Sequence, residues 1–145
     1  MLRNNDRATL MAQARQFLTM RAARREAATL TPELVAYEFQ REWVEGLARY
    51  TELEAWREGS LPSYKPLPAA DDLAEFEDYQ RYASHWGHEL EQLPRMAAAE
   101  GDGRFYYSGM AQAYLLDRLM PGWKERAFDE GVWLETLLEE ALAGS

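Results

Sequence analysis

The segment from residue 32 to residue 57 carries an uninterrupted helical pattern, and this feature constrains the fold most strongly. Its apolar residues and one glycine recur at spacings of three and four, which is typical of the buried face of a helix. They are Val35, Phe39, Trp43, Gly46, Leu47, Tyr50 and Leu53. Thr31 is a good N-cap residue and Pro32 suits the first helical position. We therefore expect one long helix from about Pro32 to about Arg57.

The same helix carries a second stripe of residues that is almost entirely charged and acidic. Its members, again three or four residues apart, are Glu38, Glu42, Glu45, Arg49 and Glu52. Such a stripe can bind a metal or a cationic ligand. It can equally be a solvated face on which arginines pair with glutamates one helical turn away. The solvated interpretation is favoured.

The rest of the chain also reads as helical. Asp6 is a candidate N-cap for a first helix that reaches Leu30, with an apolar stripe of Leu10, Ala14, Phe17, Leu18 and Met20. Further helices are expected from Asp71 or Asp72 to about Leu93, from Tyr106 to Met120, from Trp123 to Asp129, and from Val132 to Leu142. The expected inward residues of the helix from Tyr106 to Met120 are Met110, Ala113, Tyr114, Leu116 and Leu119. Because no convincing strand is present, we predict an all-α fold with five or six helices in one domain, residues 1–145.

Composition narrows the classes of protein that the chain can belong to. The formal net charge is −9, and the basic cluster Arg21, Arg24 and Arg25 is short, so nucleic-acid binding is not expected. The chain has no cysteine, its N-terminus is polar, and no apolar run is long enough to span a membrane. We expect a cytoplasmic protein that binds neither membranes nor nucleic acids.

The segment from Trp43 to Glu52, WVEGLARYTE, resembles the glutamate-bearing helix of gluzincin zinc peptidases of the aminopeptidase and glycyl-aminopeptidase groups. Their pattern is W-x-x-E-G-L-A-x-Y-x-E, and here the tryptophan and the glutamate are one residue closer together. The resemblance implies that Glu45 is a zinc ligand. It also implies that Gly46 lets the helix with the HExxH motif approach closely.

A second motif of the same family resembles Tyr106-Tyr107-Ser108-Gly109, with MAQAYLLDRL behind it. The family pattern is Y-x-x-G, and a lysine of the family is replaced by Ser108. By this resemblance Tyr106 is the donor that stabilises the oxyanion, and Tyr107 is the second candidate. The likeness covers roughly residues 36–142, so it also implies the helical half of a gluzincin catalytic domain.

The HExxH motif itself is missing. Residues 22–26, AARRE, occupy the corresponding position, and the chain has two histidines, His85 and His88. Zinc would then bind only with ligands supplied from outside this chain. We therefore expect a metallopeptidase-like helical domain that is catalytically incomplete on its own. The alternative is a non-enzymatic domain for a peptide or protein partner, or for homodimerisation, which uses its aromatic residues and the segment LPSYKPLP.

Each candidate residue also has a plainer interpretation. Glu45 can be a solvated surface glutamate, and Tyr106 can be an aromatic residue that packs at the start of a helix. His85 and His88, three residues apart beside Glu89, can bind a metal. The favoured interpretation of these histidines is that of ordinary polar-face residues, because a third ligand at a defined spacing is lacking.

Overall fold

The computed structural model describes residues 6–70, 79–97 and 101–144, and every regular element in these ranges is a helix. The longer helices are α1 (Arg7–Ala27), α2 (Pro32–Arg41), α3 (Leu47–Gly59), α4 (Tyr82–Ala97), α5 (Gly103–Leu119) and α7 (Leu134–Ala143). The short elements are the π-helical turn η1 (Glu42–Gly46), the 3-10 turns η2 (Pro68–Ala70) and η3 (Tyr79–Arg81), and α6 (Trp123–Arg126). Because all of these elements are helical, the predicted all-α fold is confirmed. The elements α2, η1 and α3 follow one another without a gap, so the predicted long helix from about Pro32 to about Arg57 is present.

The helix starts that could be predicted from capping residues are confirmed. Asp6 accepts a hydrogen bond from the backbone N–H of Thr9 at 2.9 Å, which caps α1. Thr31 does the same for α2 through the N–H of Leu34, and Pro32 is the first helical residue. The predicted cap at Asp71 or Asp72 lies outside the described residues.

The π-helical turn η1 changes which face of the long helix is buried. A π turn contains more residues than an α turn, so side chains four apart stay on one face through it. The residues buried along this helix are Glu38, Glu42, Gly46, Tyr50 and Leu53. The prediction of a solvated acidic stripe is therefore wrong for Glu38 and Glu42, which are 3% and 2% exposed. Phe39 and Trp43, predicted to be buried, are half-buried.

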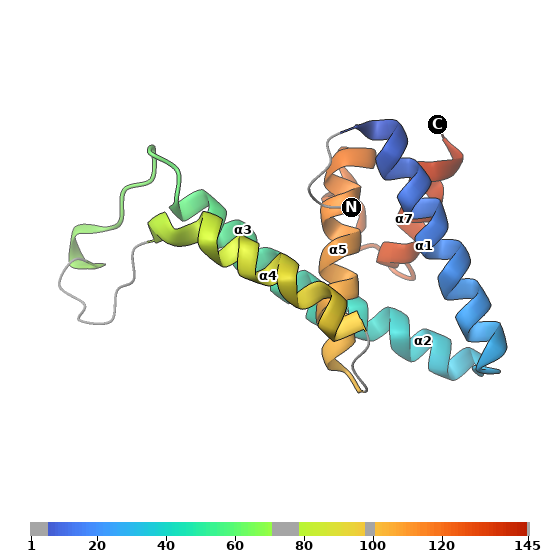
Figure 1. Ribbon diagram of the computed structural model, residues 1–145. Helices are drawn as coiled ribbons and strands as arrows, with labels where there is room; N and C mark the ends of the chain where they lie inside the picture. Colours follow the sequence, from blue (N-terminus) through green and yellow to red (C-terminus); the bar gives the residue numbers. More distant parts are fainter. Residues whose placement is uncertain (1–5, 71–78, 98–100, 145) are drawn as a thin grey trace.

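Helix α5 occupies the centre of the molecule, with α1 and α7 on one side and the paired helices α3 and α4 on the other (Figure 1). Its closest neighbour is η1, which crosses it at Gly46 and Gly109. A Cβ atom on Gly46 would lie 2.7 Å from the carbonyl carbon of Gly109, and one on Gly109 would lie 2.8 Å from the Cα of Gly46. Gly46 therefore admits a second helix at close range, and in this chain that helix is α5.

The hydrophobic core surrounds α5. It includes Met110, Leu116 and Leu119 on α5, together with Leu10 on α1 and Leu138 on α7. The predicted inward residues of α5 are largely confirmed. On α1 the prediction fails at Met20, which is 64% exposed. Within the described residues no helix is long and apolar enough to cross a membrane.

Candidate functional site

The side of η1 that faces α1 contains a buried ion pair between Glu42 and Arg21. The Arg21 guanidinium donates to both carboxylate oxygens of Glu42, one of them at 2.6 Å. Ser108 Oγ and Gln112 Nε2, both on α5, donate to the same carboxylate at 2.5 and 2.8 Å. Burial favours a neutral Arg21, but its hydrogen bonds to Glu42 and Glu135 raise its pKa above the ordinary value. Glu42 therefore joins α1, η1 and α5.

The ion pair belongs to a larger cluster, which we call the buried ionic network. It consists of Arg21, Arg24 and Arg25 on α1, Glu38 on α2, Glu42 on η1, and Glu135 on α7. Positive and negative groups balance within it, as a buried charge cluster requires.

Glu38 and Glu135 extend the network in two directions from α1. Arg25 contacts Glu38 at 3.0 Å and Glu135 at 2.7 Å, and Arg24 contacts Glu38 at 2.5 Å. Burial raises the pKa of Glu38, but the hydrogen bonds from Arg24 and Arg25 outweigh it, so the net shift is downward. Residues 22–26 therefore bring two arginines, Arg24 and Arg25, to Glu38.

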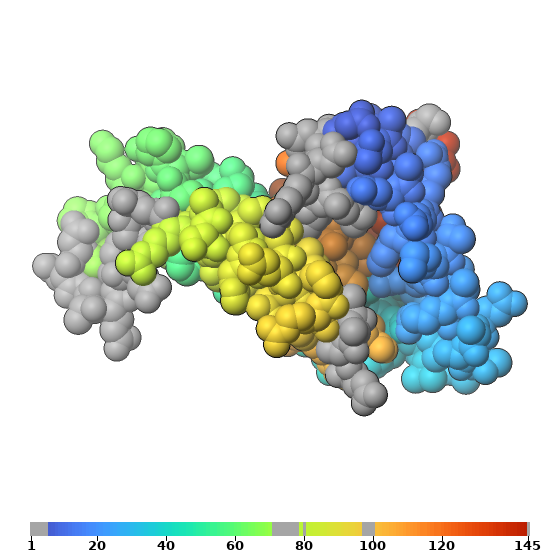
Figure 2. Space-filling model, viewed as in Figure 1, coloured from blue at the N-terminus to red at the C-terminus, as the bar shows by residue number. Residues whose placement is uncertain are grey.

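An apolar groove of about 510 Å³ lies next to this network, and we call it the α1/α4/α5 groove. Figure 2 shows it as a recess between α1 and α4, with α5 at its floor. The lining residues are Phe17, Met20, Arg21 and Arg24 of α1, Leu93 of α4, Glu42 of η1, and Arg104, Phe105, Tyr107, Ser108 and Ala111 of α5.

Another face of η1 carries the residues that the peptidase resemblance singled out. We call this side the Glu45 face, made of Tyr37, Arg41, Glu45, Asp102 and Tyr106. Glu45 pairs with Arg41 at 3.3 Å, and Arg41 reaches Asp102 at 3.0 Å. A hydrogen bond to Glu45 raises the pKa of the Tyr106 hydroxyl. Glu45 and Tyr106 are thus neighbours, and Tyr106 is 37% exposed.

The other predicted candidates lie apart from Glu45. Tyr107 faces α4, where burial and the charge of Glu89 raise its pKa. His85 stacks on Trp56 with the ring centroids 4.7 Å apart, and His88 Nε2 lies 3.3 Å from the Gln92 side chain. Across residues 6–70, 79–97 and 101–144, no group of three or more His, Cys, Asp or Glu side chains is arranged to hold a metal ion.

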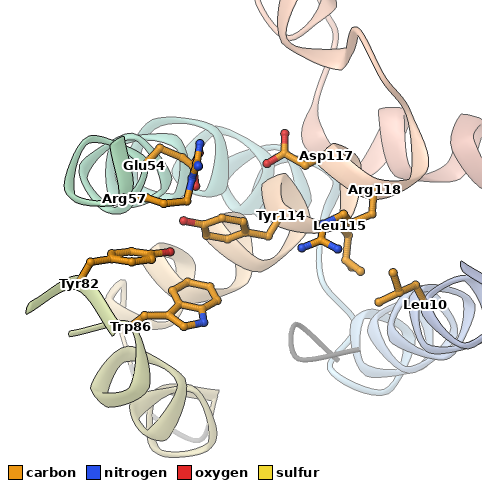
Figure 3. Close-up of a pocket in the computed structure, with 9 residues that line it drawn as sticks. All are labelled: Leu10, Glu54, Arg57, Tyr82, Trp86, Tyr114, Leu115, Asp117 and Arg118. Carbon is orange, nitrogen blue, oxygen red and sulfur yellow. The ribbon is translucent and has the colours of Figure 1, made fainter. Parts of the chain in front are cut away.

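A second cavity of about 350 Å³ lies where α3, α4 and α5 meet. In Figure 3 the rings of Tyr82, Trp86 and Tyr114 gather on one side of it, with Glu54 and Arg57 beside the Tyr114 hydroxyl. Glu54 already pairs with Arg57 at 2.9 Å. Burial, with the charge of Glu54, raises the pKa of Tyr114, so this hydroxyl stays protonated. The cavity is a polar gap between packed aromatic rings, and its charged residues Glu54 and Arg57 pair with each other.

Comparison with known protein families, curated proteins and solved structures gives no match for this chain. The site must therefore be interpreted from its own geometry. Sequence reasoning missed both the buried ionic network and the groove. One signal was available for the network, since the arginines at 21, 24 and 25 and the glutamates at 38 and 42 are spaced by single helical turns.

Proposed function

We propose that this chain is a non-enzymatic binding domain that holds an apolar group of its ligand in the α1/α4/α5 groove. The observation that carries this proposal is the groove itself. Its volume lies within the range of pockets that bind small molecules, about 300–1,000 Å³. Phe17, Met20 and Ala111 face the space between the helices without filling it.

The groove also has a rigid base, which favours binding. Arg21 and Glu42 line it while they are held by each other, and Glu42 is held in addition by Ser108 and Gln112. Side chains fixed in this way lose little conformational freedom when a ligand arrives. An apolar group that enters the groove gains about 25 cal/mol for each Å² of apolar surface removed from water.

The test uses 1-decanol, a neutral molecule with a single alkyl chain. We expect decanol to bind with a stoichiometry of one and to lose its binding in Ala111→Phe, because the added ring fills the groove. The matched control is Ala55→Phe, which places the same ring on the exposed surface of α3. Isothermal titration calorimetry gives the affinity of each variant. No decanol binding, or equal binding to all three proteins, contradicts the proposal.

A second candidate function keeps the peptidase resemblance. In it the chain is a metallopeptidase-like helical domain that needs ligands from outside to hold zinc. The proximity of Glu45 and Tyr106 supports this candidate, since the resemblance assigns both residues to one catalytic site.

Zinc titration of the chain tests the second candidate. The domain alone should show no stoichiometric zinc site, and Glu45→Ala should not change that result. A tight site with one zinc per chain would contradict catalytic incompleteness. A peptide or protein partner and a homodimer both remain predictions from the sequence, and light scattering at several concentrations would test the homodimer.

A further inference from the structure

The two ends of the α1/α4/α5 groove differ in charge. Helices α1 and α5 run in opposite directions along it (Figure 1), so Arg24 of α1 and Arg104 of α5 stand at the same end. Both guanidinium groups approach Glu38, at 2.5 and 3.8 Å. Phe17 and Ala111 line the other end, about two helical turns or roughly 10 Å away at 1.5 Å per residue.

The cationic end has donor groups that its own contacts do not use up. Arg24 and Arg104 each retain 39% or more of their side-chain exposure, whereas Glu38 retains 4%. The approach of Arg104 to Glu38 is longer than a hydrogen bond. Glu38 also stays bound by Arg25 at 3.0 Å, so Arg24 can turn to another acceptor without leaving a buried carboxylate unpaired.

This arrangement defines the chemistry of the ligand. On the basis of the proposed function, we infer that the groove binds a free fatty acid. Its carboxylate lies between Arg24 and Arg104, and its alkyl chain runs past Met20 toward Phe17 and Ala111. Guanidinium groups recognise a carboxylate through paired, charge-assisted hydrogen bonds. The chain as a whole is acidic, with a net charge of −9, so a local cationic end distinguishes this anion site from the remaining surface.

The distribution of charge favours a fatty acid over an amphipathic helix or a second copy of the chain. An amphipathic helix in a groove carries its polar residues along its full length, and matching charges would then flank the whole groove. Here the exposed arginines of the groove stand at one end, and the far end is apolar. A fatty acid, with one charged head and one apolar tail, matches this distribution of charge along the groove.

The test compares three ligands with the same ten-carbon chain, namely decanoate, 1-decanol and decyltrimethylammonium. We expect decanoate to bind about tenfold more tightly than decanol, and the cation to bind most weakly. This preference should shrink in high salt, because added ions screen the exposed arginines. Calorimetry at neutral pH provides all three affinities.

Variants locate the carboxylate. Arg24→Gln/Arg104→Gln should abolish the preference, so that decanoate binds no more tightly than decanol to this variant. The matched control Arg81→Gln/Arg126→Gln removes the same charge from exposed positions outside the groove and should retain the preference. If the double variant unfolds, Arg104→Gln alone serves, since its contact with Glu38 is the longer one.

The outcomes separate this inference from the proposed function. Equal binding of decanoate and decanol overturns the fatty-acid assignment but leaves the groove as an apolar site. No binding of either overturns both. Tighter binding of the cation, or a dimer that Ala111→Phe abolishes, overturns the fatty-acid assignment, because the groove would then have another occupant.

Discussion

The two sides of the η1 turn carry glutamates three residues apart that have opposite surroundings. Glu42 is 2% exposed and is held by Arg21, Ser108 and Gln112 at the base of the groove. Glu45 lies on the Glu45 face, where Arg41 and Tyr106 contact it at the surface. The sequence motif singles out Glu45, whereas in the structure Glu42 makes the buried polar contacts.

The difference shows that contacts with a neighbouring helix determine whether a charged side chain is buried or exposed. Both glutamates have the same intrinsic chemistry and belong to the same turn. Glu42 is buried because α1 brings Arg21 to it and because Gly46 and Gly109 let η1 approach α5 closely. Glu45 contacts Arg41 of its own helix and Tyr106 at the start of α5, and it stays partly exposed.

The largest effect is expected from neutralising each glutamate in turn. Glu42→Gln should lower the free energy of unfolding by about 3–5 kcal/mol, because it breaks a buried ion pair and leaves Arg21 undercompensated. The matched variant Glu45→Gln should change stability by no more than the error of the measurement. Urea denaturation followed by circular dichroism compares the two variants. A loss for Glu45→Gln as large as that for Glu42→Gln would contradict the comparison.

The close crossing of η1 and α5 should respond to a single methyl group. Gly46→Ala should cost about 1–3 kcal/mol, since its Cβ would meet the backbone of Gly109 and force the helices apart. Gly87→Ala is the matched control on α4, where a Cβ meets nothing within 4 Å. It should stabilise the protein by about 0.5–1 kcal/mol through helix propensity. Thermal unfolding of both variants measures the contrast, and a tolerated Gly46→Ala would argue against the crossing.

Acid should weaken the buried ionic network through the Glu38 carboxylate. The pKa of Glu38 is lowered in the folded protein. Its contribution to stability is therefore present above the unfolded pKa of about 4.3 and is lost as pH falls through the folded pKa. We expect the free energy of unfolding to fall below about pH 4, with a smaller pH dependence in Glu38→Gln. An unchanged pH dependence in that variant would show that Glu38 is not the titrating group.

The smallest effect concerns the hydroxyl of Tyr106. Its pKa should lie above the ordinary value of about 10, because Glu45 accepts its hydrogen bond. Glu45→Gln should bring the pKa back toward 10, while Glu42→Gln should leave it in place. Carbon-13 NMR of the tyrosine ring carbons during an alkaline titration follows this group. The same Tyr106 pKa in the unchanged protein and in both variants would show that Glu45 does not affect the Tyr106 hydroxyl.

The positions of the helices could be predicted because their signals are local. Asp6 and Thr31 cap helices through hydrogen bonds to residues three positions away. The inward residues of α5 follow simple spacing, and Met110 and Leu116 are fully buried as expected.

The burial of Glu38 and Glu42 could not be predicted from spacing. Their arginine partners Arg21, Arg24 and Arg25 lie on another helix, 13 to 21 residues away in the sequence. In addition, the π turn shifts the buried face of the long helix. The groove was missed for a similar reason. Phe17 and Met20 continue the apolar stripe of α1, but they line the open groove, where Met20 stays 64% exposed.

Mapping decanol onto the folded chain tests most directly whether the groove or the Glu45 face is the binding site. Amide chemical shifts of the labelled protein would be recorded during a decanol titration. We predict that the shifts concentrate at Phe17, Leu93 and Ala111 and spare Glu45 and Tyr106. Shifts centred on Glu45 and Tyr106, or none at all, would contradict the assignment of the α1/α4/α5 groove as the site.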